Sequence, residues 1–420
     1  MDQTRVAMDF ERDGRAEKHR RARVLLGATL GHMTGVTPAI HAACGLLLIP
    51  LSDEFGWSRT SLSAGLGLLS FICMVGYPLI GRYADRRGAW HIVTFGTVIF
   101  GLSLASGFVL TGSIWHFYLL YMALAVGAIL VNPTLYLKML SETHSRDFGF
   151  AAGFSGGIGV GVGYALMTIV CSIVLMNFGW RYTYLAVAAF VVIVGLTAQL
   201  GLLRSVGGRP ASASEPQSPS ADVRTSYFLR TDFWFILLGL ALMGGLMMGV
   251  MGHIIPILAD NDVPTIMAAQ AVAICNVIIL PWQPICGMLV DRYGPRIVVA
   301  PYLMTAAGLI LLLIADGWLL ILPACMLFGI GVGTQFCAIP FMVQRRFGLK
   351  SFSAVMGLLY IGLFAGQGIG PIALDIIYDQ FGSYVPAIIG AAALTVAGAA
   401  MTWVLASRPT GNETPAVCRL

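Results

Sequence analysis

Few side chains in this sequence could do acid–base chemistry, and those few lie within long apolar runs. Thr34, Thr37 and His41 have i, i+3, i+7 spacing, which places them on one face of a helix. Imidazole changes its charge near neutral pH, so His41 and His253 are candidates to carry a proton or to meet a carboxylate. Asp375 is the carboxylate expected inside an apolar run, and it is a third proton candidate. The alternative is that the histidines only pack against backbone carbonyls and that Asp375 is a solvated helix-end residue.

Other polar and aromatic side chains in the runs are candidates to contact a small solute. They are Asn132, Tyr136, Asn276, Trp282, Gln283, Gln335, Tyr360 and Gln367. Simple packing is the alternative for the aromatic members. Lys138 lies near the end of its run, so we expect its ammonium to extend to lipid phosphates. The glycines of 153–163 and of 366–370 predict close helix packing, since no Lys-Ser/Thr follows to make a phosphate loop.

The composition is that of a chain surrounded by lipid. It is 57% apolar and 11% charged, with mean hydropathy +0.82, whereas a soluble protein carries about a quarter charged residues. The net charge of +5 is not gathered on one face or tail, which argues against a nucleic-acid partner. The eight cysteines have neither CxxC nor metal-ligand spacing. We therefore expect no metal site, no disulfide framework and no cofactor.

The apolar runs have the length of membrane-spanning helices, which need about 20 residues and must satisfy their own backbone in lipid. Twelve are predicted: 24–50, 58–80, 91–112, 115–138, 148–176, 181–203, 232–258, 265–286, 297–315, 318–343, 353–377 and 383–406. The polar first 23 residues lack the pattern of a cleavable signal peptide. An even number of spans places 23 of the 25 Lys and Arg residues on the side of the termini. This segregation predicts a multi-pass protein of the inner membrane with both termini cytoplasmic.

A ten-residue phrase occurs twice, at half the length of the chain. GRYADRRGAW at 81–90 returns as GMLVDRYGPR at 287–296, and the two aspartates are 206 positions apart. Two equivalent halves are therefore predicted, joined by a Ser/Pro-rich stretch typical of a flexible linker. The predicted boundaries are a cytoplasmic N-tail 1–23, a six-helix bundle 24–203, a cytoplasmic linker 204–231, a second bundle 232–406 and a cytoplasmic C-tail 407–420.

With its motif G-x-x-x-D-R-x-G-x-R/K, the chain resembles the major facilitator superfamily. The motif positions are Gly81, Asp85, Arg86 and Gly88 in the first copy, and Gly287, Asp291, Arg292, Gly294 and Arg296 in the second. The first copy departs from the motif at Trp90. The resemblance implies an all-α fold of twelve transmembrane helices in two pseudo-symmetric six-helix bundles around one central cavity. It also implies that the motif residues form a conformational latch, in which each aspartate pairs with arginines or lies at a helix N-terminus. The alternative is that they only fix topology and loop geometry.

Three phrases look like the monocarboxylate-porter and related organic-anion branches. They are FGWSR at 55–59, FGWR at 178–181, and Gly370-Pro371 followed by Tyr378-Asp379. The chain departs from those porters in the span 265–286, which has no acid and no arginine.

The expected function is secondary active transport of a small organic anion, a monocarboxylate or an aromatic acid, by alternating access. Its partners would be the solute, a proton or other coupling ion, and the lipid bilayer, and a monomer is expected. Two alternatives remain: a proton-coupled efflux antiporter of hydrophobic compounds, and a transporter-like solute sensor. An enzyme is not expected, because the sequence offers no nucleophile–base pair, metal constellation or Walker A sequence.

Overall fold

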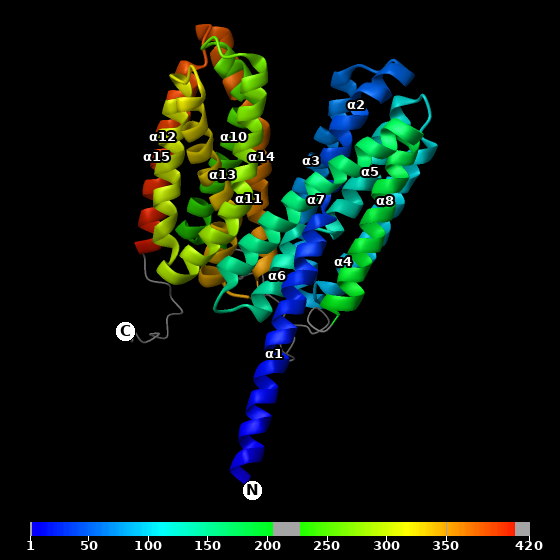
Figure 1. The fold of residues 1–420 in the computed structure, drawn as a ribbon, viewed down its shortest axis with the longest axis vertical. Coiled ribbons are helices and arrows are strands. Elements are labelled where there is room, and N and C mark those ends of the chain that lie inside the picture. Colours follow the sequence, from blue (N-terminus) through cyan, green and yellow to red (C-terminus); the bar gives the residue numbers. More distant parts are fainter. Residues whose placement is uncertain (1, 205–226, 350, 408–420) are drawn as a thin grey trace. The chain divides into compact units, whose positions relative to one another are not determined.

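The structure, a computed structural model, describes residues 2–204, 227–349 and 351–407, and every regular element within these ranges is a helix. Most of the predicted linker 204–231 and of the C-tail 407–420 lies outside the described residues. The helices, labelled as in Figure 1, are α1 (Asp2–Met33), η1 (Thr37–His41), α2 (Ala42–Phe55), α3 (Arg59–Arg87), α4 (Trp90–Ser106), η2 (Gly107–Val109), α5 (Ile114–Leu130), α6 (Pro133–Thr143), α7 (Phe148–Phe178), α8 (Trp180–Leu196), η3 (Thr197–Leu203), α10 (Thr231–Ala259), α11 (Thr265–Tyr293), η4 (Pro295–Val298), α12 (Val299–Leu313), α13 (Trp318–Phe347), α14 (Phe352–Phe381) and α15 (Val385–Ser407).

Eleven helical stretches in the described ranges are long and apolar enough to cross a bilayer. They correspond to the second to twelfth predicted crossings. The first predicted crossing, 24–50, is instead assembled from the end of α1, the π-helical turn η1 and the start of α2, because the helix breaks at Thr34 and Gly35. The predicted all-α membrane fold is confirmed, with an interruption in its first crossing that periodicity did not indicate.

The chain divides into two compact units. Unit 1 comprises residues 1–73, 83–146 and 158–212, and unit 2 comprises 74–82, 147–157 and 213–420. Two helices therefore contribute to both units: α3 gives residues 74–82 to unit 2, and α7 gives its first turns, 147–157. The predicted boundaries, 24–203 and 232–406 for the two bundles, follow the chain and stay a prediction.

Unit 1 is built around α4, which packs between α5 and α8, while α1 packs on α6 and η3. Phe100 of α4 and Phe117 of α5 are fully buried in its core. In unit 2, α12 packs against α13 and α15, and α11 packs against α13. The longest helix pairing of unit 2 joins α10 and α14.

Glycine makes the α10–α14 pairing close. A Cβ at Gly366 would overlap the carbonyl of Ala241, and one at Gly370 would overlap the backbone of Gly245. Both partners advance by four residues together, so the two helices run side by side in the same direction. The glycine spacing in the sequence predicted such packing. His253 and Asp375 lie beyond these glycine contacts on the same two helices.

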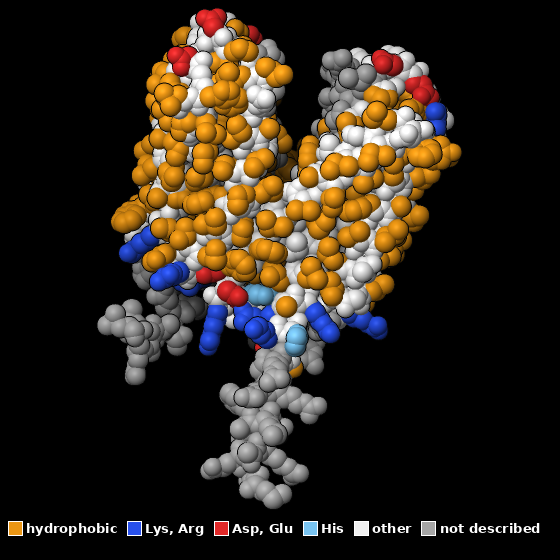
Figure 2. Space-filling model, in the orientation of Figure 1, with side chains coloured by type: hydrophobic (Ala, Val, Ile, Leu, Met, Phe, Trp, Pro, Cys, Tyr) orange, Lys and Arg blue, Asp and Glu red, His pale blue; other side chains and the backbone are white. Residues whose placement is uncertain are grey.

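Side chains of different polarity occupy different parts of each unit's surface. Apolar side chains cover the flanks, and Lys and Arg gather at one end of each unit (Figure 2). In unit 2, Arg230, Arg292 and Arg345 lie where α10 begins and where α11 and α13 end. Asp260 and Asp379 lie at the opposite ends of α10 and α14. An apolar belt between charged ends suits a protein that spans a bilayer.

Candidate functional site

His253 of α10 and Asp375 of α14 form a hydrogen-bonded pair in unit 2. The Nε2 of His253 lies 2.9 Å from an Oδ of Asp375, and the Nδ1 lies 2.6 Å from the carbonyl oxygen of Gly249. The His253 side chain is 15% exposed, and the Asp375 side chain is 60% exposed. The sequence proposed these two residues separately as proton carriers. The structure brings them together across 122 positions of the chain.

A tyrosine lies beside the histidine of this pair, and a second tyrosine stacks on the first. The ring of Tyr384 lies 5.6 Å from the imidazole, and Tyr378 stacks on Tyr384 at 4.4 Å. Tyr384 is 8% exposed and lies between α14 and α15. Burial raises the pKa of its hydroxyl, and the nearby carboxylates of Asp375, Asp260 and Asp379 raise it further. The hydroxyl therefore stays neutral at physiological pH.

A second polar group in unit 2 joins α10, α11 and α13. The indole Nε1 of Trp282 donates to the Oγ1 of Thr334 at 2.8 Å. The Nε2 of Gln335 donates to the Sδ of Met247 at 3.9 Å, and a thioether is a weak acceptor. The side-chain oxygens of Gln335 and Gln283 are buried, and neither has a hydrogen-bond partner among the described residues. These amides are the unsatisfied polar groups of unit 2 that a solute could complete.

Three other predicted residues of unit 2 are placed differently. Tyr360 makes an edge contact with Tyr77 at 5.7 Å, and Gln367 is half-buried on α14. Asn276 is exposed and donates to the carbonyl of Val272 in its own helix.

The three residues predicted to share a face of the first crossing are separated by the break in the helix. Thr34 is buried and donates back to the carbonyl of Gly31 at 3.1 Å, whereas Thr37 is exposed. His41 closes the π-helical turn η1, and its buried Nδ1 has no hydrogen-bond partner among the described residues. The i, i+3, i+7 argument assumed a continuous helix, so it was wrong about the shared face. Turns of this kind are frequent at functional sites.

Asn132 and Tyr136 have separate structural roles in unit 1. The side-chain oxygen of Asn132 caps α6 by accepting from the backbone N–H of Thr134 at 2.8 Å. The hydroxyl of Tyr136 accepts from the Nε2 of Gln199 at 3.1 Å, and the same nitrogen donates to Thr97 at 2.6 Å. Gln199 and Thr97 were missed by the sequence analysis. The sequence feature that could have indicated them is an amide and a hydroxyl side chain within otherwise apolar runs.

The first motif copy contains a buried ion pair. The Nζ of Lys138 lies 2.7 Å from the carboxylate of Asp85 and also donates to the carbonyl of Ala84 at 3.1 Å. The side chains of Lys138 and Asp85 are only 4% and 8% exposed. The prediction that Lys138 reaches lipid phosphates was wrong, because a closer carboxylate lies on the neighbouring helix. Arg86 is exposed.

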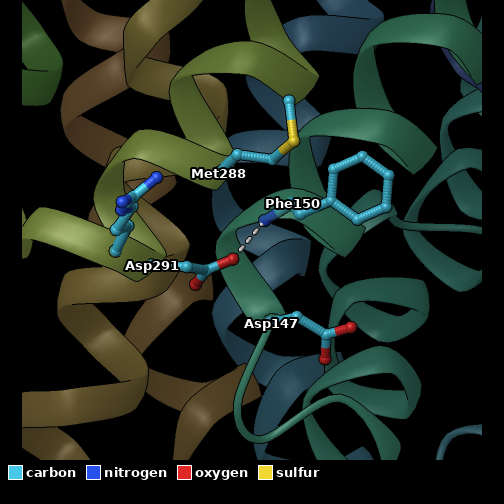
Figure 3. Close-up of a pocket in the computed structure, with 5 residues that line it drawn as sticks. Asp147, Phe150, Met288 and Asp291 are labelled. Carbon is cyan, nitrogen blue, oxygen red and sulfur yellow. Dashed lines mark hydrogen bonds between the residues drawn. The ribbon is translucent and has the colours of Figure 1, made fainter.

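The second motif copy holds the start of another helix (Figure 3). The two carboxylate oxygens of Asp291 accept from the backbone N–H groups of Gly149 and Phe150, at 2.8 and 2.7 Å. These N–H groups belong to the first turn of α7, which has no intrahelical acceptors for them. An open depression of about 390 Å³, lined by Asp147, Phe150, Met288, Asp291 and Arg292, lies beside this contact. Asp291 was expected either to pair with arginines or to lie at a helix N-terminus, and it lies at the N-terminus of α7.

The motif glycines act in two ways. Gly88 and Gly294 end α3 and α11 with φ of 86° and 78°, a backbone conformation that other residues rarely adopt. Gly81 and Gly287 permit close approach, since a Cβ on Gly81 would overlap the carbonyl of Ser353 and one on Gly287 that of Gly149. The exposed guanidinium groups of Arg292 and Arg296 lie over the rings of Tyr293 and Trp403.

The arrangement supports proton exchange and hydrogen bonding. In the described ranges, no group of three or more His, Cys, Asp or Glu side chains could hold a metal ion. The groups that remain are one imidazole–carboxylate pair, two incompletely satisfied amides and an indole. These can bind a neutral or anionic solute and one proton.

Comparison with known proteins identifies the type of protein. A sequence profile described as Major Facilitator Superfamily matches residues 33–357. The fold resembles the proton:xylose symporter XylE bound to 6-bromo-6-deoxy-D-glucose, with a TM-score of 0.68 and 15% identity over 92% of this chain and 96% of that one. It also resembles the E. coli fucose:proton symporter FucP, with a TM-score of 0.67 and 15% identity over 92% and 97% of the two chains.

A further similarity joins 99 residues to the agnestins efflux protein AgnL12 of Paecilomyces divaricatus, at 34% identity over 23% of this chain and 22% of that relative. At these identities the solved structures show the fold alone, whereas the profile covers most of the chain. The chain is a multi-pass membrane transporter, and it belongs to the Major Facilitator Superfamily.

Proposed function

We propose that the chain is a proton-coupled carrier that takes up a small organic anion, a monocarboxylate or an aromatic acid, by alternating access. The observation that carries this proposal is the His253–Asp375 pair, with 2.9 Å between its nitrogen and oxygen. Ionisable side chains within membrane-spanning helices are costly, so a pair retained there is a candidate for function. An imidazole and a carboxylate in contact can take up and release a proton.

The anionic solute is supported by the kind of polar groups near the middle of the spans of unit 2. Gln335, Gln283 and Trp282 are uncharged there, so they would not repel an anion. The amide N–H of Gln335 donates to a thioether at 3.9 Å, and a carboxylate is a far stronger acceptor. The phrases that resemble organic-anion porters support the same class, whereas the absence of an arginine from α11 separates this chain from the lactate-type porters.

The direction of insertion is part of the proposal. The basic ends of both units would face the cytoplasm, with both termini on that side of the inner membrane. The Asp85–Lys138 pair and the Asp291 contact with α7 would then be cytoplasmic contacts that are made in one conformation and released in another. His41, at the π-helical turn, is the candidate of unit 1 for solute binding.

Uptake into proteoliposomes with an imposed pH gradient tests the proposal. We expect one or more carboxylates to enter the vesicles together with protons, which drive the uptake and acidify the vesicle interior. His253→Gln and Asp375→Asn should abolish the accumulation driven by the gradient. Asp379→Asn is the matched control, because it removes an exposed acid from the next turn of the same helix and should leave uptake unchanged. Uptake by both pair variants that matches the wild type at every pH would refute proton carriage by the pair.

The similarity to an efflux protein over 99 residues favours a second candidate, proton-coupled export of hydrophobic compounds. The same vesicles separate the two. In export, solute and protons move in opposite directions, and hydrophobic compounds compete with one another for transport. Carboxylates would then have no effect on transport.

A further inference from the structure

We infer that the His253–Asp375 pair binds a single proton and that this proton joins the outer ends of α10 and α14, which come apart when it leaves. The inference rests on the proposed function, because it takes the proposed proton site and adds that proton binding changes the contact between α10 and α14. It predicts that protonation closes the contact and deprotonation opens it. A conventional salt bridge would behave in the opposite way when its acid is protonated.

The first step concerns which ring nitrogen carries hydrogen. The partner of Nδ1 is the carbonyl oxygen of Gly249, at 2.6 Å, and a carbonyl can only accept. Nδ1 therefore bears a hydrogen in both the neutral and the charged ring. It follows that the neutral ring presents a lone pair at Nε2, toward Asp375.

The second step concerns the contact at Nε2. An oxygen of Asp375 lies 2.9 Å from that nitrogen, which is a hydrogen-bond distance and requires one hydrogen between the two atoms. Either the ring is an imidazolium that donates to a carboxylate, or the acid is protonated and donates to the neutral ring. With neither proton present, a lone pair faces a negative oxygen and the contact is repulsive. The hydrogen bond is thus present at lower pH and lost as pH rises.

The third step concerns what the contact holds. The glycine contacts between α10 and α14 are tight up to Gly370, and the pair lies just beyond them. Pro371 follows directly, and Pro256 lies three residues after His253. Proline has no backbone N–H, so each helix lacks one interior hydrogen bond at this level and can bend there. His253 precedes Pro256 in α10, whereas Asp375 follows Pro371 in α14. The pair therefore ties the end of α14, which can bend at Pro371, to α10.

The surroundings decide how the proton reaches the pair. Tyr384 lies against the imidazole, and Tyr378 stacks on Tyr384. Asp260 and Asp379 are the other charged groups of this region, and both act on the hydroxyl of Tyr384. The His253 side chain is 15% exposed, whereas Asp375 is 60% exposed, so the carboxylate is the entry point for the proton.

The tautomer is tested first, by 15N NMR of the protein labelled at histidine. The chain has seven histidines, and a His253→Gln difference spectrum assigns the signal of interest. At high pH we expect the neutral Nδ1–H form. A neutral ring with its hydrogen on Nε2 at high pH would overturn the inference.

We call the hydrogen bond between His253 and Asp375 the clasp. It is tested by measuring the distance between two spin labels, attached at Ala259→Cys and Phe381→Cys in a protein that lacks Cys44 and Cys418. Both label sites are exposed at the ends of α10 and α14. In the wild-type pair we expect the ratio of short to long distances to fall about tenfold per pH unit, the slope of a one-proton step. Asp375→Asn should keep the short distance at every pH, because its amide supplies the hydrogen permanently.

Asp375→Ala should keep the long distance at every pH, since nothing then bridges the helices. A pH response in Asp375→Asn equal to that of the wild type, or no response in the wild type, would refute the clasp. The distances are independent of transport. A missing uptake with an intact clasp would count against the proposed function alone, and normal proton-driven uptake without a clasp would count against this inference alone.

Discussion

The ammonium of Lys138 and the carboxylate of Asp85 lie 2.7 Å apart, and both side chains are almost completely withdrawn from solvent. The pair joins α6 to the last turns of α3 within unit 1. Each charge in such a place is tolerable only because the other neutralises it. Removal of one partner leaves an uncompensated buried charge, whereas removal of both leaves none.

We therefore predict that Lys138→Met lowers the free energy of unfolding by about 3–5 kcal/mol, because the buried carboxylate of Asp85 loses the ammonium that neutralises it. The double variant Lys138→Met/Asp85→Asn should recover most of this loss. Arg86→Ala, at an exposed neighbouring position, should change stability by no more than about 0.5 kcal/mol. Unfolding in detergent, followed by circular dichroism, measures all three. Equal losses for Lys138→Met and the double variant would show that the ion pair is not the source of the effect.

The contact of Asp291 with α7 predicts a change in turnover. Asp291→Asn removes the charge that faces the first N–H groups of the helix, which weakens the contact by about 1 kcal/mol. If the contact is made in one conformation only, kcat should fall while KM changes little. Initial rates of uptake over a range of solute concentrations provide both values. Asp147→Asn, at the rim of the same depression, is the control, and an equal loss of turnover there would argue against a specific role for Asp291.

Sequence patterns predicted the helices far better than they predicted the contacts between side chains. The length of each apolar run is a local property, so eleven crossings could be read directly. The ends predicted at 80 and 286 were too early, because α3 and α11 continue through the motif to Arg87 and Tyr293. The pairing of His253 with Asp375 depends on the register of α10 against α14, which glycine contacts set in space. Lys138 was assigned to lipid because nothing local indicates the buried carboxylate beside it. Thr34 was misplaced because periodicity cannot reveal a break within an apolar run.

Replacement by alanine should affect stability differently at the motif glycines, which have positive φ, and at a glycine inside a helix. Gly88→Ala and Gly294→Ala force a Cβ into a conformation it disfavours, so each should lower the free energy of unfolding by about 1 kcal/mol. Gly239→Ala is the matched control, because this residue lies inside α10 with open space around its Cα. There alanine should be neutral or stabilise by up to about 1 kcal/mol. Thermal unfolding of the three variants checks the contrast, and a stabilising Gly294→Ala would contradict it.

In unit 1, Glu54 of α2 predicts a pH-dependent contribution to stability. Its carboxylate accepts from the indole N–H of Trp180 and pairs with Arg181 at 2.9 Å. The indole hydrogen bond and the adjacent guanidinium hold the pKa of Glu54 below its usual value of 4.5. A carboxyl with a lowered folded-state pKa stabilises the fold above about pH 4.5, and this stabilisation is lost as pH falls through the lower folded value. Because the side chain is 39% exposed, water screens part of the effect.

The difference in Tm between the wild type and Glu54→Gln measures this contribution. It should be constant from about pH 7 to pH 5 and should shrink toward zero as the pH is lowered further, because both proteins then carry a neutral side chain at this position. Asp53→Asn is the matched control, since Asp53 is the exposed neighbour of Glu54 in α2. A Tm difference for Glu54→Gln that stays constant to pH 3 would show that packing of the side chain, and not its charge, accounts for the stabilisation.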